Sequence, residues 1–237
     1  MLTSDNVGVG VLAEHVQCMR LSALLRGSLC ERLAQRPGRR VRPGSSIYIM
    51  GDPAQSIFYV RGGLVKSSVV SSAGNEMTLR MHRAGDIFGE LCLCTGTRRE
   101  RAVALEASEI VELLLPELLT QLRNNPQQML ELTTAVCEHV DEAYEKLRSL
   151  WFDPTMQRLG RELLNLASSL GEPVSEGTRI SYYITQADIA QLVGVRREVV
   201  SGLLNRLREQ RLVGYSRKSH IWVDCAGLQS YLDRMAS

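Results

Sequence analysis

Residues 185–207 constrain the fold of this 237-residue chain more tightly than any other stretch. Thr185 is a favourable helix N-cap, and Gly194 stands where a first helix must end in a tight turn. Ala190, four residues before Gly194, has the small side chain that two closely crossing helices need. Beyond the turn, apolar side chains recur where a second helix would pack on the first: Val195, Val200 and Leu203. The pattern predicts two helices, the second from residue 196 to about 210, in the helix-turn-helix arrangement.

Basic residues are concentrated in the second of these helices and just beyond it. Between residues 196 and 218 there are 7 basic and 2 acidic residues, a local charge of 7 − 2 = +5. The whole chain has 28 basic and 26 acidic residues. A positive cluster on a helix-turn-helix predicts binding to double-stranded DNA. The alternative is a helical hairpin in the core with a solvated charged face, which would leave the coincidence of the two signals unexplained.

Individual side chains of this segment have predicted roles on DNA. The N-terminal residues of a recognition helix reach base edges in the major groove. Arg197 is predicted to donate two hydrogen bonds to guanine, and Glu198 to accept one from cytosine. Residues 214–223 are predicted to form a β-wing whose tip lies against the DNA backbone. The residues expected to contact DNA are Thr185, Gln186, Arg196, Arg197, Glu198, Ser201 and Lys218.

A different pattern fills residues 41–115, after a helix predicted for residues 12–34. Short β-prone runs alternate with turn signals such as Pro43-Gly44, Gly62-Gly63 and Gly85-Asp86. Turns at intervals of about 8–12 residues are typical of an antiparallel sandwich or barrel. Such a barrel can enclose a small ligand.

A long helix is predicted from Pro126 to residue 153, where Asp153-Pro154 ends it. Apolar residues recur along it at spacings of 3, 4, 4, 3, 4 and 3: Met129, Leu132, Val136, Val140, Ala143, Leu147 and Leu150. We interpret this narrow stripe as the seam of a parallel helix dimer. The alternative is one amphipathic helix packed on its own domain, for which a broader stripe is expected.

The order of these parts resembles the CRP/FNR family of bacterial transcription regulators. The resemblance is strongest from Ile184 to Val199 and in the run from Gly85 to Leu91. It implies an α+β fold with an N-terminal, jelly-roll-like antiparallel β-roll, a long dimerisation helix and a C-terminal winged helix-turn-helix. It also implies an effector-sensing domain over residues 1–125, the dimerisation helix over 126–153 and a DNA-binding domain over 154–237.

The same resemblance implies a ligand pocket in the roll, formed by Gly89, Glu90, Arg101, Ala102 and Glu142. In members that bind cAMP, backbone N–H groups and an Arg hold the cyclic phosphate, and the Glu accepts a ribose hydroxyl. Glu90 matches, and Arg101 takes the Arg role if one residue is inserted, with Arg98 and Arg99 as rivals. Ala102 lacks the expected hydroxyl, and Glu142 occupies a position at which cAMP-binding members have a hydroxyl residue that contacts the adenine. These departures favour a different effector, or none, over a cyclic nucleotide.

Redox and metal cofactors are weakly supported by the sequence. The oxygen-sensing branch of the family holds an iron–sulfur cluster on four thiolates, but the N-terminal region here has only Cys18 and Cys30. No iron–sulfur cluster, haem or other metal site is therefore expected. Cys92 and Cys94 lie near several Arg residues that would lower a thiol pKa, so a thiol-redox response is one hypothesis and core packing is the other.

Other functional classes are disfavoured. No nucleophile–base motif or phosphate-binding glycine loop is recognisable, so we expect no catalytic activity. There is no signal-peptide pattern or membrane-length apolar run, so the protein is expected to be cytoplasmic. The leading hypothesis is a homodimeric transcription regulator that would contact RNA polymerase if it activates. A cyclic-nucleotide module that controls a partner protein is the alternative, and it does not account for the helix-turn-helix.

Overall fold

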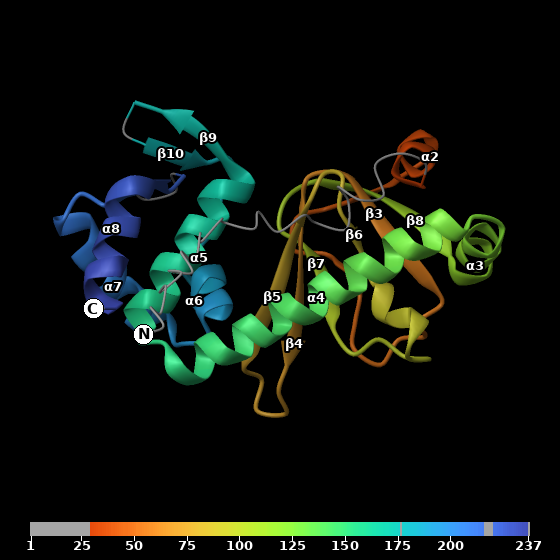
Figure 1. The fold of residues 1–237 in the computed structure, drawn as a ribbon, viewed down its shortest axis with the longest axis horizontal. Helices are drawn as coiled ribbons and strands as arrows, with labels where there is room; N and C mark the ends of the chain where they lie inside the picture. Colours follow the sequence, from red (N-terminus) through yellow and green to blue (C-terminus); the bar gives the residue numbers. More distant parts are fainter. Residues whose placement is uncertain (1–28, 176, 216–219, 237) are drawn as a thin grey trace, which may run out of the picture.

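The computed structural model describes residues 29–175, 177–215 and 220–236 (Figure 1). Most of the helix predicted for residues 12–34 lies outside these residues, and its described end is α2 (Leu29–Gln35). Two structured halves flank the long helix α4 (Pro126–Phe152), which runs along the roll and ends beside the C-terminal half (Figure 1).

The N-terminal half is a β-roll made of two four-stranded antiparallel sheets. One sheet has the order β1 (Arg39–Val41), β8 (Ser108–Leu114), β3 (Ser56–Gly62) and β6 (Ile87–Phe88). The other has the order β2 (Ser46–Tyr48), β7 (Arg101–Ala104), β4 (Leu64–Val70) and β5 (Glu76–Arg83). The predicted α+β class with an antiparallel roll is thus confirmed.

Aromatic side chains fill the inside of the roll. The rings of Tyr48, Phe58 and Phe88 are stacked, with centroids 5.5 Å apart for Tyr48–Phe58 and 5.3 Å for Phe58–Phe88. His82 stacks on Phe88 at 5.1 Å from the opposite sheet. Aromatic contacts of this kind add to the free energy gained by burial, so the two sheets are joined by a packed interior.

Helix α4 has two different apolar faces. On one face Leu132 is buried beside Leu118 and Leu122 of α3 (Leu115–Asn124). At the far end Leu150 reaches Gly194, where an added Cβ would lie 3.0 Å from Leu150 Cδ2. Leu132 and the half-buried Leu150 therefore contact their own protomer, and their place in the dimer seam stays a prediction. The stripe predicted from the sequence spacing had combined residues of both faces of α4.

The other face of α4 is exposed and has a strict heptad spacing of 3, 4, 3, 4, 3 and 4. Its members, the α4 heptad, are Leu130, Thr133, Cys137, Val140, Tyr144, Leu147 and Trp151. Tyr144, Leu147 and Trp151 are 66%, 62% and 84% exposed in the protomer. Val140 and Leu147 of the predicted seam belong to the α4 heptad, while three other exposed residues of that seam, Met129, Val136 and Ala143, lie beside it.

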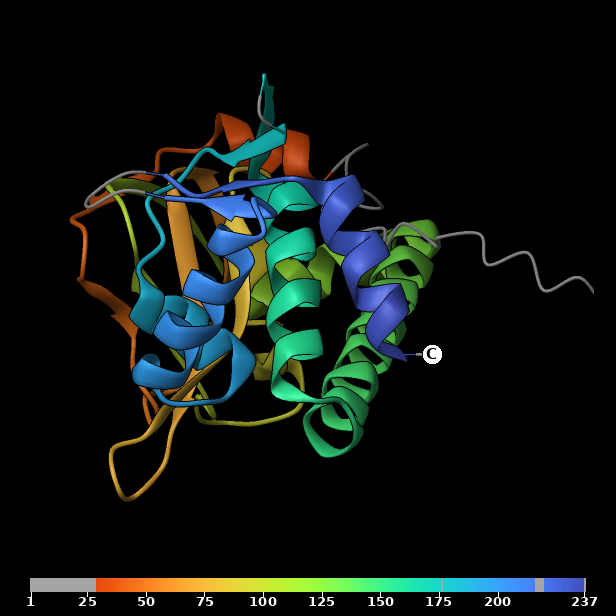
Figure 2. The ribbon, with the colours of Figure 1, turned by 90° about the vertical axis from the view of Figure 1, so that its left-hand side faces the viewer.

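The C-terminal half is a helical domain with a small sheet. It contains α5 (Thr155–Leu170), α6 (Gln186–Val193), α7 (Arg197–Glu209) and α8 (Cys225–Ala236). Its antiparallel sheet has the order β11 (Val213–Gly214), β12 (Trp222–Val223), β10 (Gly177–Ile180) and β9 (Gly171–Val174). Figure 2 shows α8 on one side of α5, with α6 and α7 on the other.

The core of this domain lies between its helices and its sheet. Leu159, Ile189 and Leu204 are fully buried there. Two parts of the domain were not predicted from the sequence, the strand β9, which pairs with β10, and the helix α8. Both depend on the domain core, since α8 is held through the buried Leu228 and Leu232.

Candidate nucleic-acid interface

A capping box begins the first helix of the predicted helix-turn-helix. Thr185 Oγ1 accepts a hydrogen bond from Asp188 N at 3.1 Å, and Asp188 Oδ2 accepts one from Thr185 N at 3.1 Å. The Thr185 hydroxyl also donates to Asp188 Oδ2 at 2.5 Å. Its proton is thereby used inside the protein, so Thr185 acts here as a cap. Gln186, the first residue of α6, is half-exposed.

The turn between the two helices requires glycine at position 194. Gly194 has φ +73° and ψ +41°, the left-handed region in which a side chain is strained. Its N–H donates to Ala190 O at 2.9 Å, and the N–H of Val195 donates to the same oxygen at 3.0 Å. These two bonds close the first helix and set the direction in which α7 leaves.

Helix α7 buries one face and exposes its first turn. Val200, Leu204 and Leu207 are fully buried. The sequence left Val199 and Val200 as alternatives for the inward position. The structure places Val200 inside and leaves Val199 44% exposed on the outer face. Only the register of the helix on its core decides between two adjacent valines.

The charged residues at the start of α7 face solvent. Arg196, Arg197 and Glu198 are exposed, and Ser201, one turn further on, is half-buried. Neither Arg196 nor Arg197 forms an ion pair with any residue that the structure describes. Both guanidinium groups are thus available to an external acceptor. The structure brings together the predicted base-reading residues on one exposed edge.

A β-hairpin follows α7, as predicted. Strands β11 and β12 pair antiparallel, with Gly214 opposite Trp222. Tyr215 ties the hairpin to the helix because its hydroxyl donates to Asn205 Oδ1 at 2.9 Å and its ring lies 5.1 Å from the Arg208 guanidinium carbon. Lys218, assigned to the tip, lies outside the described residues.

Inside the roll, Arg98 is a structural side chain. It donates to Gly89 O at 2.9 Å and to Ser56 O at 2.6 Å, and its guanidinium lies 4.3 Å from the Tyr48 ring centroid. Gly89 itself has φ +81°, and a Cβ there would lie 2.8 Å from Arg98 Nη1. This glycine therefore allows the close approach of Arg98 to the backbone.

Two of the residues expected to form a cyclic-nucleotide pocket, Glu90 and Glu142, are linked through His139 and Arg80. Arg101 donates to Glu76 Oε1 at 3.0 Å, on β5, and Ala102 is a buried residue without a hydroxyl. Glu142 forms an ion pair with Arg80. Glu90 accepts a hydrogen bond from His139 Nδ1 of α4 at 3.0 Å. Without a ligand, Arg101 and Glu142 thus pair with residues of the chain itself, and their role in a pocket stays a prediction.

An acidic side chain lies deep in the same region. Glu100 is buried and accepts a hydrogen bond from the Tyr48 hydroxyl at 2.8 Å. Burial raises the pKa of Glu100 above its ordinary value, and the nearby Glu90 adds to the effect. Burial likewise lowers the pKa of His82 to about 4, so this ring is neutral at pH 7. A cyclic phosphate at these side chains would lie near a buried acid, and Arg98 and Arg101 both donate hydrogen bonds to groups of the chain itself.

Cys92 and Cys94 of the roll have different environments. Burial raises the pKa of the Cys92 thiol despite the nearby Arg98, which disfavours a reactive thiolate there. Cys94 is exposed. Within residues 29–175, 177–215 and 220–236, no three His, Cys, Asp or Glu side chains are grouped so as to hold a metal ion. No helix in the described part of the chain is long and apolar enough to cross a membrane.

Comparisons with known proteins agree with both halves of the structure. Residues 38–125 match the cyclic nucleotide-binding domain, and residues 157–231 match the Crp-like helix-turn-helix domain. The global nitrogen regulator of Synechocystis sp. is 30% identical over 176 residues, which cover 73% of this chain and 78% of that protein. The cyclic AMP receptor protein of Thermus thermophilus is 30% identical over 177 residues, covering 74% and 79%.

Solved structures show the same fold. FixK2 from Bradyrhizobium japonicum superposes with a TM-score of 0.73 at 22% identity, covering 81% of this chain and 95% of that one. The regulator CLP of Xanthomonas campestris gives a TM-score of 0.69 at 22% identity, covering 81% and 96%. The order of roll, long helix and helix-turn-helix is common to them. Together with the exposed arginines on α7, these matches show that the chain belongs to the CRP/FNR family of DNA-binding transcription regulators.

Proposed function

We propose that this chain is a homodimeric regulator, without catalytic activity, that binds a palindromic promoter site in the cytoplasm. The observation that carries the proposal is the exposed edge formed by Arg196, Arg197 and Glu198 on a helix held by a capped turn. We divide the chain into a sensing domain (1–125), a dimerisation helix (126–153) and a DNA-binding domain (154–237). A regulator of this kind that activates would contact RNA polymerase at the promoter.

In the proposed complex, three consecutive residues at the start of α7 read bases. Arg197 donates to guanine O6 and N7, and Glu198 accepts from cytosine N4. Val199, whose side chain is 44% exposed, contacts a thymine methyl group. Sequence reasoning did not identify Val199, because its exposure depends on the packing of Val200. Gln186 and Arg196 would bind phosphates, with Ser201 further along the groove and Lys218 on the wing.

Arg197→Ala is expected to weaken binding to the preferred site by about 1–3 kcal/mol and to relax specificity at one base pair. The reason is that a bidentate contact to guanine is lost while phosphate contacts remain. Fluorescence anisotropy against a series of single-base-pair variants measures both effects. Arg179→Ala is the matched control, because Arg179 is an exposed cation of the same domain that pairs with Glu172 at 3.2 Å. Equal weakening on every sequence would instead make Arg197 a phosphate contact.

The proposed dimer pairs the α4 heptads of two protomers in parallel. Its support is the strict spacing of an exposed, largely apolar face on the side of α4 away from the roll. On the other side, His139 and Lys146 contact the roll. Two helix-turn-helix units would then be related by a two-fold axis, as the half-sites of a palindrome are.

Parallel pairing predicts that Cys137 can be cross-linked to Cys137 of a second copy. Equivalent core positions of a parallel coiled coil face each other across the axis, and a disulfide needs Cα atoms about 4.4–6.8 Å apart. Diamide treatment should therefore give a covalent dimer on a non-reducing gel. Cys94→Ser, which removes another exposed thiol, should leave the product unchanged, and Cys137→Ser should remove it. Absence of the product from the unaltered protein would argue against in-register pairing.

A further inference from the structure

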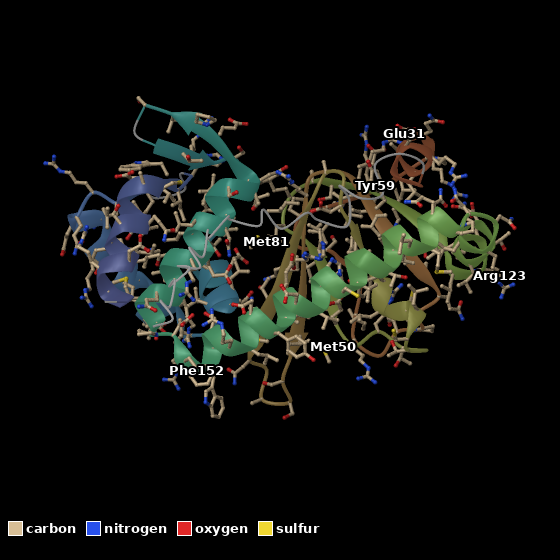
Figure 3. The ribbon with its side chains drawn as sticks, in the orientation of Figure 1. Glu31, Met50, Tyr59, Met81, Arg123 and Phe152 are labelled. Atoms are coloured by element: carbon tan, nitrogen blue, oxygen red, sulfur yellow. The ribbon has the colours of Figure 1, made fainter. Side chains whose placement is uncertain are left out.

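The DNA-binding domain is docked on the outer face of β4 and β5 of its own protomer. Leu64 and Met81 of the roll belong to the same buried apolar cluster as Leu159 and Ile189 of the C-terminal domain. In Figure 3 Met81 lies where the roll meets α5, and Figure 1 shows α6 beside β5. The two domains therefore share one core.

A buried lysine lies in the middle of this contact. Lys66, on β4, is 6% exposed. Its Nζ donates to Gln191 Oε1 at 2.6 Å and to Asp188 Oδ1 at 3.2 Å, both on α6. Gln191 Nε2 donates in turn to Glu76 Oε2 at 3.1 Å, and Glu76 Oε1 lies 3.5 Å from Lys66 Nζ. We call these four residues, Lys66, Glu76, Asp188 and Gln191, the Lys66 latch.

Every residue of the latch has at least one partner in the other domain. Glu76 also accepts hydrogen bonds from the Ser68 hydroxyl at 2.6 Å and from Arg101 at 3.0 Å. Removing one partner of such a buried network leaves the others without compensation, which is far more costly than losing a surface ion pair. Loss of one latch residue is therefore expected to weaken the docked arrangement.

The latch acts on the helix that begins the DNA-binding motif. Asp188 holds both Lys66 and the N-cap Thr185, so the roll contacts α6 at its capping box. In the same arrangement Arg196 and Arg197 remain exposed. Docking thus fixes α6 and leaves the reading edge of α7 free.

We propose that Lys66 is a positioning residue for DNA binding: through Asp188 and Gln191 it holds the helix-turn-helix on the roll in the orientation that fits the operator. The proposal rests on the proposed DNA-binding function. Two recognition helices in a dimer must match half-sites about 34–36 Å apart, so each has to be held at a set place and angle. A domain that leaves the docked position can bind the operator only while it is docked. The apparent affinity is then the affinity of the docked form multiplied by the fraction of molecules that are docked.

The test is Lys66→Met, which keeps the length of the side chain and removes its charge. Operator affinity should fall on the order of tenfold, within the usual range of coupling between sites. The slope of log affinity against log salt should stay unchanged, because no phosphate contact is lost. Arg36→Met is the matched control: it also removes one cation, from an ion pair with Glu117 at 2.9 Å, and it should leave operator affinity unchanged.

A second variant keeps the test decisive if Lys66→Met does not fold. Gln191→Ala removes only an amide, and it should weaken operator binding in the same direction. In the double variant the loss of operator-binding free energy should be smaller than the sum of the two single losses, because both changes break one network. Unchanged or tighter operator binding by folded variants overturns the proposal, and so does a salt slope reduced by about one, which would make Lys66 a phosphate contact. Failure of the unaltered protein to bind any duplex would instead remove the proposed function.

Discussion

Leu147→Asp is expected to give monomers and to reduce affinity for the full palindrome by about 10²–10⁴-fold, the gain that linking two binding units provides. Leu147 is 62% exposed in the protomer, so the change leaves the core of each subunit intact. In the dimer, however, it would bury two carboxylates against each other in an apolar seam. The cost of an unpaired buried charge exceeds that of any single lost apolar contact.

Sedimentation equilibrium measures the association, and anisotropy with palindromic and half-site duplexes measures the binding. Binding to a half-site should change little, since α7 is untouched. Leu114→Asp is the matched control, because Leu114 is 56% exposed at the end of β8, away from the α4 heptad. A dimer that survives Leu147→Asp would exclude the α4 heptad as the interface.

Gly194→Val is expected to destabilise the C-terminal domain and to reduce operator affinity at least tenfold. The left-handed backbone conformation of Gly194 is unfavourable by about 1–3 kcal/mol for a residue that has a side chain, and most unfavourable for a β-branched residue. The added atoms also meet Leu150, 3.0 Å away, at the end of α4. Relief of this strain must rotate α7 relative to α6, which moves Arg197 from its place on the reading edge.

Urea unfolding followed by circular dichroism measures the loss of stability, and anisotropy measures the loss of binding. Gly96→Val is the control, because an added Cβ there meets nothing within 4 Å and the residue lies in the roll. A variant at Gly194 that keeps both stability and affinity would show that the turn does not require the left-handed conformation.

Much of the fold could be predicted from short-range patterns. Thr185, Ala190 and Gly194 are enough to predict both helices and the turn, because capping and left-handed termination depend on neighbours a few residues away. Likewise, β-prone runs between turn signals were expected in residues 41–115, and β4 (Leu64–Val70) is one of them. These regularities, together with the local positive charge, pointed to a DNA-binding member of a known family.

Other features depend on contacts between distant parts of the chain. The apolar residues of α4 could not be divided between the roll and a second copy, because a periodicity does not say what lies on each side. The sequence favoured Arg101 for the phosphate role with Arg98 and Arg99 as rivals, and only the packed roll directs Arg98 inward and Arg101 to Glu76. Lys66, an unremarkable residue in a strand, meets Asp188 across 122 positions of sequence.

Local sequence thus determined most of the helices and strands, the turn at Gly194 and the charge of α7, because propensity, capping and periodicity act over a few residues. The tertiary structure alone decided which face of α4 is free, which arginine is buried and where the helix-turn-helix docks. Those outcomes depend on which distant surfaces exclude water from one another, and no pattern within one segment contains that information.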